Sequence, residues 1–216
     1  MQEMTTAEER WGRLCEAAGC DRPAAAERWR LIASAYAEPQ RHYHTLDHIE
    51  ALLALRDAHA ALFPACDIAD LAILLHDVVY DPARQDNEAV SAAWARAQFG
   101  QLAFPAATID AVARWIELSR HDPVDVAAVD PASGLAAFLD LDLSVLAADP
   151  PDYRAYTHAI RREYAIYPDR LYRPGRARVL ARFLERPAIY LSERFHTAWE
   201  ERARRNIAAE LRELEA

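Results

Sequence analysis

The apolar residues of this chain recur at helical spacing, and alternating strand patterns are scarce. The capping box Thr6-x-x-Glu9 predicts a helix that opens at that point and stops near Gly19. Pro23 and Pro105 occupy positions where first-turn prolines start helices. Caps and apolar spacing together predict helices over residues 23–37, 45–62, 67–79, 87–98, 105–119, 152–166, 174–185 and 192–213. We therefore expect an all-α protein.

Loops are expected where Pro, Asp, Ser and Gly cluster, at residues 80–86, 121–134 and 147–152. No internal repeat, low-complexity tract or dividing linker separates the predicted helices. A chain of 216 residues, 52% of them hydrophobic, is long enough to bury a full core as one domain.

One segment, Ile68 to Leu75, is apolar nearly all round, which indicates a helix packed on several sides. His76 and Asp77 follow it directly, so this ionisable pair is expected to be buried. Burying an imidazole and a carboxylate without compensation costs roughly several kcal/mol, and such groups persist mainly when they are paired or bound to a metal. The end of this helix is therefore a candidate ligand site.

Further candidate ligands lie on both sides of the pair. Upstream, His44 and His48 share a face if their segment is helical. Downstream, Asp140 and Asp142 lie inside another apolar stretch. Imidazole and carboxylate donors suit Mn, Fe, Co, Ni or Mg, with positions left for water, better than they suit a closed thiolate zinc site.

In this order, the residues resemble the HD superfamily of metal-dependent phosphohydrolases, named after an adjacent His-Asp pair. The resemblance spans roughly residues 40–210 and is nearest to a branch of about this length described as predicted HD hydrolases. Its motifs are Tyr43-His44-x-x-x-His48-Ile49, His76-Asp77-Val78-Val79-Tyr80-Asp81, Asp86-Asn87-Glu88, Asp140-Leu141-Asp142-Leu143, Tyr156-x-x-x-Ile160-Arg161-x-Glu163-Tyr164, Gly175-Arg176 and Ala203-Arg204-x-Asn206.

The resemblance implies one HD-type helical domain over residues 1–216, with a metal-site core at about 40–150 and C-terminal helices at about 151–216. It implies hydrolysis of a phosphoester or phosphoanhydride bond in a phosphorylated small molecule, a nucleotide or related metabolite. Enzymes that hydrolyse guanosine alarmones have Glu-Asp after His-Asp-Val-Val, where this chain has Tyr80-Asp81. That narrower specificity is not expected.

The ligands that the resemblance implies for a divalent ion are His48, His76, Asp77 and Asp142. Asp140 competes with Asp142 for the last position. We prefer Asp142 because Asp-Leu-x-x-Leu continues the helix as in the family, which leaves Asp140 as a cap.

Catalytic roles follow for three residues: Asp77 takes a proton from water, and Glu88 or His44 protonates the leaving oxygen. His44 has two further interpretations, a ligand of a second metal and a hydrogen-bonded interior histidine. Arginines balance the charge of phosphate. The candidate substrate-binding residues are Arg41, His121, Arg161, Tyr164 and Arg176.

These residues have structural interpretations as well. The arginines and Tyr164 can belong to solvated or salt-bridged helix faces. His121 can complete the dipole at a helix C-terminus, and Glu88 suits the first turn of a helix in any case. Asp86 suits a helix start and Asn87 is a good N-cap.

Two other function classes stay open. An HD-type di-iron oxygenase needs histidines beyond the four ligands, and His44 and His121 supply them. A non-catalytic regulatory module would bind a metabolite without turning it over. One ion per chain with phosphatase activity favours hydrolysis, whereas two irons with oxygen consumption favour oxidation.

The amino-acid composition restricts the classes of molecule that the protein is expected to bind. The formal net charge of −9 argues against nonspecific binding to a nucleic acid polymer or an anionic membrane. The sequence contains no lysine, so all 25 of its Lys and Arg side chains are arginine. The absence of lysine excludes Schiff-base catalysis and a Walker-type phosphate-binding lysine. We expect a small phosphorylated molecule as partner, and the sequence gives no indication of the oligomeric state.

The three cysteines, Cys15, Cys20 and Cys66, form no CxxC pair and are expected to be reduced thiols. The N-terminal residues lack a positive region followed by an apolar one, and no apolar run approaches the roughly 18 residues needed to span a bilayer. We expect a cytoplasmic protein.

Overall fold

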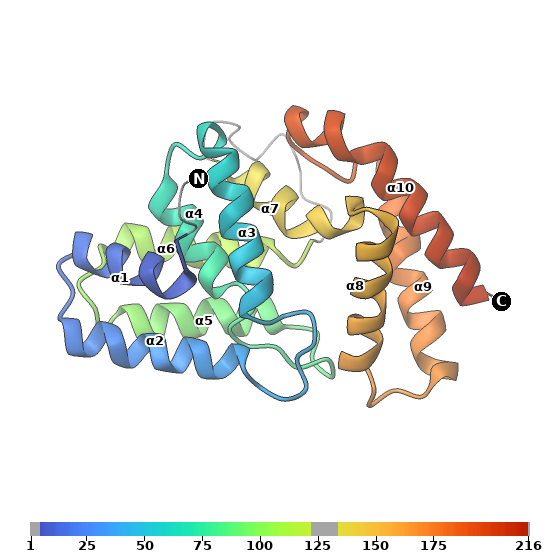
Figure 1. Cartoon of the computed structure of the whole chain (residues 1–216). Coiled ribbons are helices and arrows are strands. Elements are labelled where there is room, and N and C mark those ends of the chain that lie inside the picture. Colours follow the sequence, from blue (N-terminus) through green and yellow to red (C-terminus); the bar gives the residue numbers. More distant parts are fainter. Residues whose placement is uncertain (1–4, 122–133, 216) are drawn as a thin grey trace. The chain divides into compact units, whose positions relative to one another are not determined.

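The computed structural model of the chain describes residues 5–121 and 134–215, and helices joined by turns make up this part of the protein. No strand occurs among the described residues, which confirms the all-α prediction (Figure 1). In the same residues, no helix has both the length and the apolar character that a membrane crossing requires. The α-helices are α1 (Ala7–Ala17), α2 (Arg22–Tyr36), α3 (Leu46–Ala58), α4 (Cys66–Leu75), α5 (Asn87–Phe99), α6 (Ala106–Leu118), α7 (Leu135–Asp142), α8 (Pro150–Glu163), α9 (Asp169–Glu185) and α10 (Glu193–Glu215), with short 3-10 helices η1 (Ala60–Leu62) and η4 (Leu143–Ala147).

The chain forms two compact units, Met1–Phe138 and Leu139–Ala216. The division falls inside α7, so this helix begins in the first unit and ends in the second. The single HD-type domain expected over residues 1–216 stays a prediction. The predicted loop at 121–134 lies, apart from its two ends, outside the described residues.

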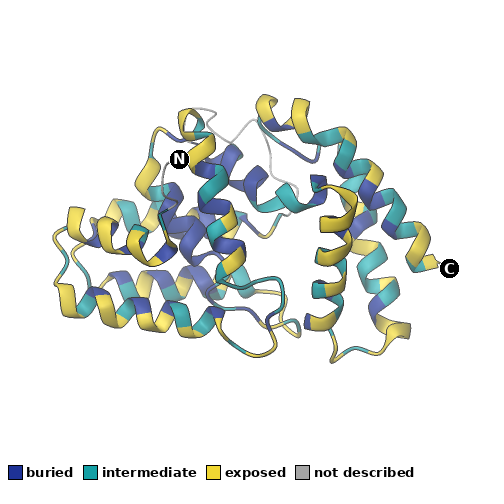
Figure 2. Ribbon diagram, viewed as in Figure 1, coloured by how far each residue is buried: buried dark blue, intermediate teal, exposed yellow. Residues whose placement is uncertain are grey.

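The core of the first unit is built around α4, whose residues Ala69 to Leu75 are all buried (Figure 2). This is most of the apolar run that the sequence singles out. Helices α1, α3, α5 and α6 pack against α4. Because burying one leucine or isoleucine side chain contributes about 1.5–3 kcal/mol, this central helix supplies much of the stability of the unit.

The predicted helix starts are largely confirmed. The Thr6–Glu9 capping box is formed: Glu9 N donates to Thr6 Oγ1 at 3.2 Å and Thr6 N donates to Glu9 Oε2 at 2.9 Å. Pro23 lies in the first turn of α2, as expected, behind the N-cap Asp21. Pro105 occupies the N-cap position of α6, one residue earlier than a first-turn proline would.

The prediction that one helix covers 67–79 is wrong at its end, because α4 stops at Leu75. Arg41 explains the difference. Its Nη1 donates to the main-chain oxygen of Asp77 at 2.6 Å, and its Nη2 donates to that of Val78 at 3.1 Å. The guanidinium satisfies these carbonyl groups without a further helical turn, and His76 and Asp77 lie in the turn after α4.

Other boundaries differ from the prediction as well, and α8 covers Pro150–Glu163 where a helix over 152–166 was expected. Helix α3 ends at Ala58, and η1 follows it where one helix was expected to run to residue 62. Helix α9 starts at Asp169, not at 174, so Pro174 lies inside the helix. Pro168 is the N-cap residue, and its carbonyl oxygen accepts hydrogen bonds from the main chain of the first turn.

The start of α7 is held within the first unit. Gly134 precedes it with φ +82°, and a Cβ atom there would lie 3.0 Å from the Leu62 carbonyl oxygen, so the position requires glycine. One turn later, the Phe138 ring stacks on Trp115 at a centroid distance of 5.6 Å and meets the His76 ring edge-on at 6.1 Å. These contacts hold the part of α7 that belongs to the first unit.

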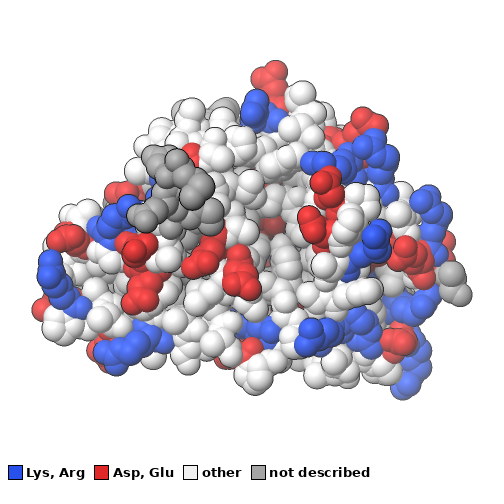
Figure 3. Space-filling model, in the orientation of Figure 1, with Lys and Arg blue, Asp and Glu red and all other residues white. Residues whose placement is uncertain are grey.

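In the second unit, α10 packs against α9 and η4. A buried network joins Arg176, Tyr153 and Glu210: Arg176 Nε donates to Glu210 Oε1 at 2.7 Å, and the Tyr153 hydroxyl donates to Glu210 Oε2 at 2.6 Å. On the outside, arginine and acidic side chains lie next to one another, as Figure 3 shows for one face of the molecule.

Two carboxylates hold the segment before α10. Glu200 accepts hydrogen bonds from the main-chain N–H groups of Ile189 and Tyr190 at 3.0–3.2 Å. Asp140 accepts from those of Leu191 and Ser192 at 2.6 and 2.7 Å. Four consecutive amides are thus bound by two acidic side chains.

A buried ion cluster anchors α4 to its neighbours. Asp70, 3% exposed, lies 2.8 Å from Arg56 Nε and 3.2 Å from Arg10 Nη1. Burial raises the pKa of Asp70 to about 6, although both arginines act to lower it. The cluster is costly to desolvate and costly to break.

We expect Asp70→Ala to lower the free energy of unfolding by about 3–5 kcal/mol, because two largely buried guanidinium groups lose their buried partner. Urea denaturation followed by circular dichroism measures the change. The control is Asp110→Ala, which removes a 76% exposed carboxylate lying 3.8 Å from Arg96, and which should change the free energy by less than about 1 kcal/mol. Equal effects of the two substitutions would contradict this interpretation.

Candidate metal centre

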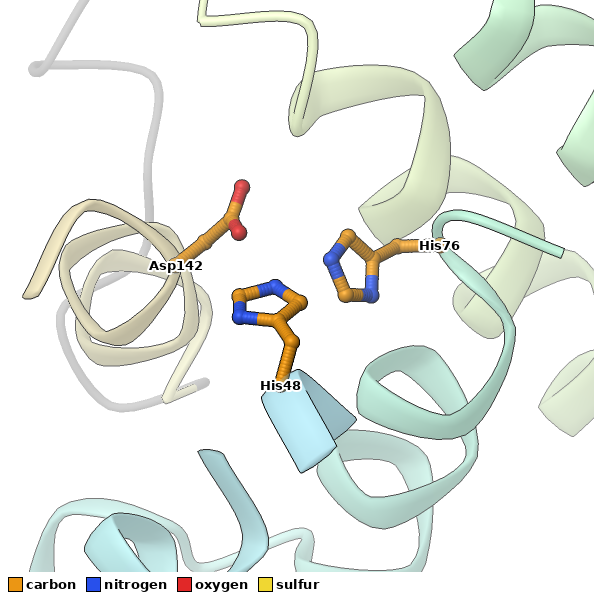
Figure 4. Close-up of side chains that lie close together, drawn as sticks. All are labelled: His48, His76 and Asp142. Atoms are coloured by element: carbon orange, nitrogen blue, oxygen red, sulfur yellow. The ribbon is translucent and has the colours of Figure 1, made fainter. Parts of the chain in front are cut away.

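Three of the predicted ligands lie together in the structure. One ligand atom each of His48, His76 and Asp142 lies within 4.8 Å of the other two. Figure 4 shows the two imidazole rings and the carboxylate facing one another, from α3, from the residue after α4, and from the end of α7. Two ligand atoms bonded to one ion at about 2.1 Å lie at most about 4.2 Å apart, so shifts of less than about 1 Å suffice to bind a cation.

The position of Asp142 follows from helical periodicity. Phe138 contacts His76, and Asp142 comes four residues later on the same helix, so the two side chains share a face. Asp140 lies on a different face and binds the main chain of residues 191–192. Asp140 therefore caps the segment before α10, and it is Asp142 that joins the two histidines.

The surroundings of His76 fix which ring nitrogen is available. His76 Nδ1 lies 2.9 Å from the carbonyl oxygen of Ile73, and because a carbonyl only accepts, Nδ1 carries the hydrogen. In the neutral ring, Nε2 then presents its lone pair. Asp77 Oδ2 lies 3.0 Å from this Nε2, so a proton or a metal ion is needed between the two acceptors.

The 3.0 Å separation is also that of neighbouring ligands around an octahedral ion with bonds of about 2.1 Å. Asp77 is nevertheless not a member of the group formed by His48, His76 and Asp142. Its role as the fourth ligand stays a prediction. The donor set of two imidazoles and carboxylates fits the divalent ions named above, Mn, Fe, Co, Ni or Mg.

His44 lies close to this group but outside helix α3, so the face that it would share with His48 in a helix is not formed. The centroids of the two rings are 6.0 Å apart. The His44 ring stacks on buried Tyr80 at 4.2 Å, and Tyr43 contacts both histidines. His44 is half-buried, and its role as a catalytic acid stays a prediction.

Arg41, a predicted substrate-binding residue, is buried beside the candidate ligands. Besides Asp77 and Val78, its guanidinium donates to the main-chain oxygen of His44 at 3.3 Å and to Glu38 Oε2 at 3.1 Å. These bonds tie the segment before α3 to the turn after α4. In the structure Arg41 thus holds the main chain on both sides of the candidate ligands. Its role in substrate binding stays a prediction.

Glu88 lies in the first turn of α5, as expected. Burial raises its pKa, and the Asp77 carboxylate raises it further, while its own main-chain N–H, His121 and Arg120 act in the other direction. Glu88 is therefore within electrostatic reach of both Asp77 and His121. His121 follows α6 with a φ of 54°, uncommon for a residue other than glycine.

The prediction that Asn87 is an N-cap is wrong by one residue, because Asp86 occupies that position. Asn87 instead bonds the main chain of Asp81 in both directions: its Nδ2 donates to Asp81 O, and its Oδ1 accepts from Asp81 N, each at 3.0 Å. Ser91 similarly accepts from Val79 N and donates to Val79 O. Helix α5 thereby fixes the chain that leaves the His76-Asp77 pair.

The other candidate substrate-binding residues lie in the second unit. Arg161 forms an ion pair with Asp169 at 2.7 Å and donates to the carbonyl oxygen of Tyr164 at 3.0 Å. Arg176 forms the buried pair with Glu210. Both guanidinium groups bind groups of the protein, as the structural interpretation expects, and substrate binding by these residues and Tyr164 stays a prediction.

Sequence reasoning missed two residues that shape the site, Phe138 and Ile73. The four-residue spacing of Phe138 and Asp142 was a signal that they share a helical face. The orientation of the His76 ring by the Ile73 carbonyl had no signal in the sequence, because a main-chain acceptor is the same for every residue type.

No family model, curated protein or solved structure matches the chain. Membership of the HD superfamily stays a prediction from the sequence motifs.

We expect Asp142→Asn to weaken Co²⁺ binding at least about tenfold while leaving the unfolding free energy within about 1 kcal/mol. Asp140→Asn should lower the unfolding free energy, because it breaks the hydrogen bonds that hold residues 191–192. It should leave Co²⁺ binding unchanged, because Asp140 is not one of the three clustered ligands. Calorimetric titration with Co²⁺ and urea denaturation of both variants measure the two effects. Weaker metal binding in Asp140→Asn alone would contradict the assignment.

Proposed function

We propose that this protein is a metal-dependent phosphohydrolase that acts on a phosphorylated small molecule, a nucleotide or related metabolite. The observation that carries the proposal is the convergence of ligand atoms from His48, His76 and Asp142 within 4.8 Å. These residues belong to the ordered motifs that resemble the HD superfamily. A divalent ion bound there would polarise a phosphoryl oxygen and make a nearby water molecule a stronger nucleophile at neutral pH.

The side chains around this group supply acid and base chemistry. In the proposal Asp77 accepts a proton from the attacking water, since its carboxylate is partly exposed and lies beside His76. Glu88 donates a proton to the leaving oxygen. Its raised pKa supports this role, because the side chain keeps its proton to a higher pH than an ordinary glutamate does. His44 is the alternative donor.

The charge of the chain favours a small substrate over a polymer. With a formal net charge of −9, the protein lacks the basic field that draws nucleic acids to a surface. Arg120 and His121 lie near Glu88, where they can balance part of the charge of a phosphate group.

The test is a screen of phosphorylated metabolites for released phosphate, with the bound metal of the purified chain quantified first and Mn²⁺, Co²⁺, Ni²⁺ and Mg²⁺ added in turn. We expect metal-dependent release that Asp77→Asn lowers at least about 100-fold in kcat. The matched control is Asp110→Asn, an exposed aspartate on α6 that should leave the rate unchanged.

An unaltered rate in Asp77→Asn would remove the hydrolase proposal. Two irons per chain with oxygen consumption and no released phosphate would favour the di-iron oxygenase, for which the nearness of both Asp77 and His121 to Glu88 is the supporting observation. Tight metabolite binding without turnover would favour a regulatory module.

Glu88 gives the reaction a pH dependence. Because the proton donor must be protonated, kcat should fall as the pH rises through the raised pKa of Glu88. Glu88→Gln should lower kcat about 100-fold or more and remove this alkaline limb, whereas Glu117→Gln, on the exposed side of α6, should change neither. The measurement is a pH–rate profile of the wild type and of the two variants. An unchanged alkaline limb in Glu88→Gln would exclude Glu88 as the donor.

A further inference from the structure

The end of α1 has a specific hydrogen-bond pattern. Gly19 N donates to Glu16 O at 3.0 Å and Cys20 N donates to Cys15 O at 2.9 Å, and Gly19 has a φ of +74°. These are the two bonds and the left-handed residue of a Schellman motif, with Ala18 as the C-cap. In this motif the third helical residue from the end commonly contacts the second residue after the cap. Here those residues are Cys15 and Cys20.

The motif therefore brings two thiols together where other proteins place a hydrophobic contact. The Cys20 side chain is close enough to Cys15 to act on its pKa. The main-chain bond of 2.9 Å also limits the separation of the two Cα atoms. Standard bond lengths and a Cα–C–O angle of about 120° put the two Cα atoms at most about 6.8 Å apart, which is the upper end of the range seen across disulfides.

We propose that Cys15 and Cys20 form a reversible intrachain disulfide, a redox modification site at the junction of α1 and α2. Both thiols are free in the structure. The main-chain hydrogen bond of the cap keeps Cys15 and Cys20 within this range of Cα separations while the helix stays formed. The site involves none of the candidate metal ligands, so the proposal is independent of the phosphohydrolase proposal.

The exchange with a small disulfide such as glutathione disulfide takes two steps. Half-buried Cys20 loses its proton and attacks one sulfur of glutathione disulfide, which releases one glutathione thiolate and leaves glutathione bound to Cys20. Cys15 then loses its proton and attacks the Cys20 sulfur, which releases the second glutathione. In total the protein loses two hydrogens and two electrons, and glutathione disulfide is reduced to two molecules of glutathione.

The different environments of the two thiols set the order of the steps. Cys15 is 2% exposed, and burial, with a smaller effect of Cys20, raises its pKa to about 12. Its thiolate is therefore scarce at neutral pH, and the second step is the slow one. The rate of closure should rise about tenfold per pH unit in the neutral range.

The experiment uses the full chain in glutathione redox buffers, with acid quenching and mass spectrometry of the intact protein and its peptides. We expect the loss of two hydrogens, a peptide link between residues 15 and 20, and full reversal by dithiothreitol. Cys66→Ser should behave as the wild type does, since Cys66 is the exposed third thiol. Cys15→Ser should stop at a mixed disulfide on Cys20.

A comparison with the unfolded chain tests whether the Schellman motif favours closure of the disulfide. The equilibrium constant for closure should be at least about tenfold larger in buffer than in concentrated urea, because the fold holds the thiols together. Gly19→Ala, which puts a side chain at a positive φ, should reduce that ratio. Equal constants in buffer and urea, a lasting glutathione adduct in the wild type, or disulfides between chains would each overturn the proposal.

Discussion

The buried guanidinium of Arg41 is the interaction on which the candidate site depends. It binds three main-chain carbonyl groups, those of His44, Asp77 and Val78. In doing so it ends α4 at the point where the apolar run gives way to His76, and it joins the segment that leads into His48. A side chain remote in sequence thus determines where two ionisable residues are held.

Arginine serves throughout this lysine-free chain as a binder of the protein's own carbonyl and carboxylate groups. Arg161 binds the turn after α8, Arg176 pairs with Glu210, and Arg204 binds the carbonyl groups of residues 184 and 186. The planar, multiply donating guanidinium suits such sites as well as it suits phosphate. Sequence alone does not distinguish the two uses, since the same guanidinium donors serve both.

Local signals in the sequence predicted most of the fold. The Thr6–Glu9 capping box and Pro23 act within one helical turn, so their effect is readable from neighbouring residues. The end of α4 was not predictable in this way, because it depends on a guanidinium from residue 41. For the site, the sequence motifs suggested His48, His76 and Asp142 as ligands of one ion. The proximity of their ligand atoms is a property of the folded chain that no local signal reveals, because the three residues are far apart in sequence.

The last turn of α7 carries two carboxylates with different surroundings. Asp140 is fully committed to hydrogen bonds with the segment before α10, while Asp142, half a turn further on, faces two imidazoles. The hydrogen bonds of Asp140 hold the last turn of α7 against residues 191–192 within the second unit. Because these hydrogen bonds already order the main chain at the end of α7, a cation that bound Asp142 would cost less ordering of that turn than it would in a loose segment.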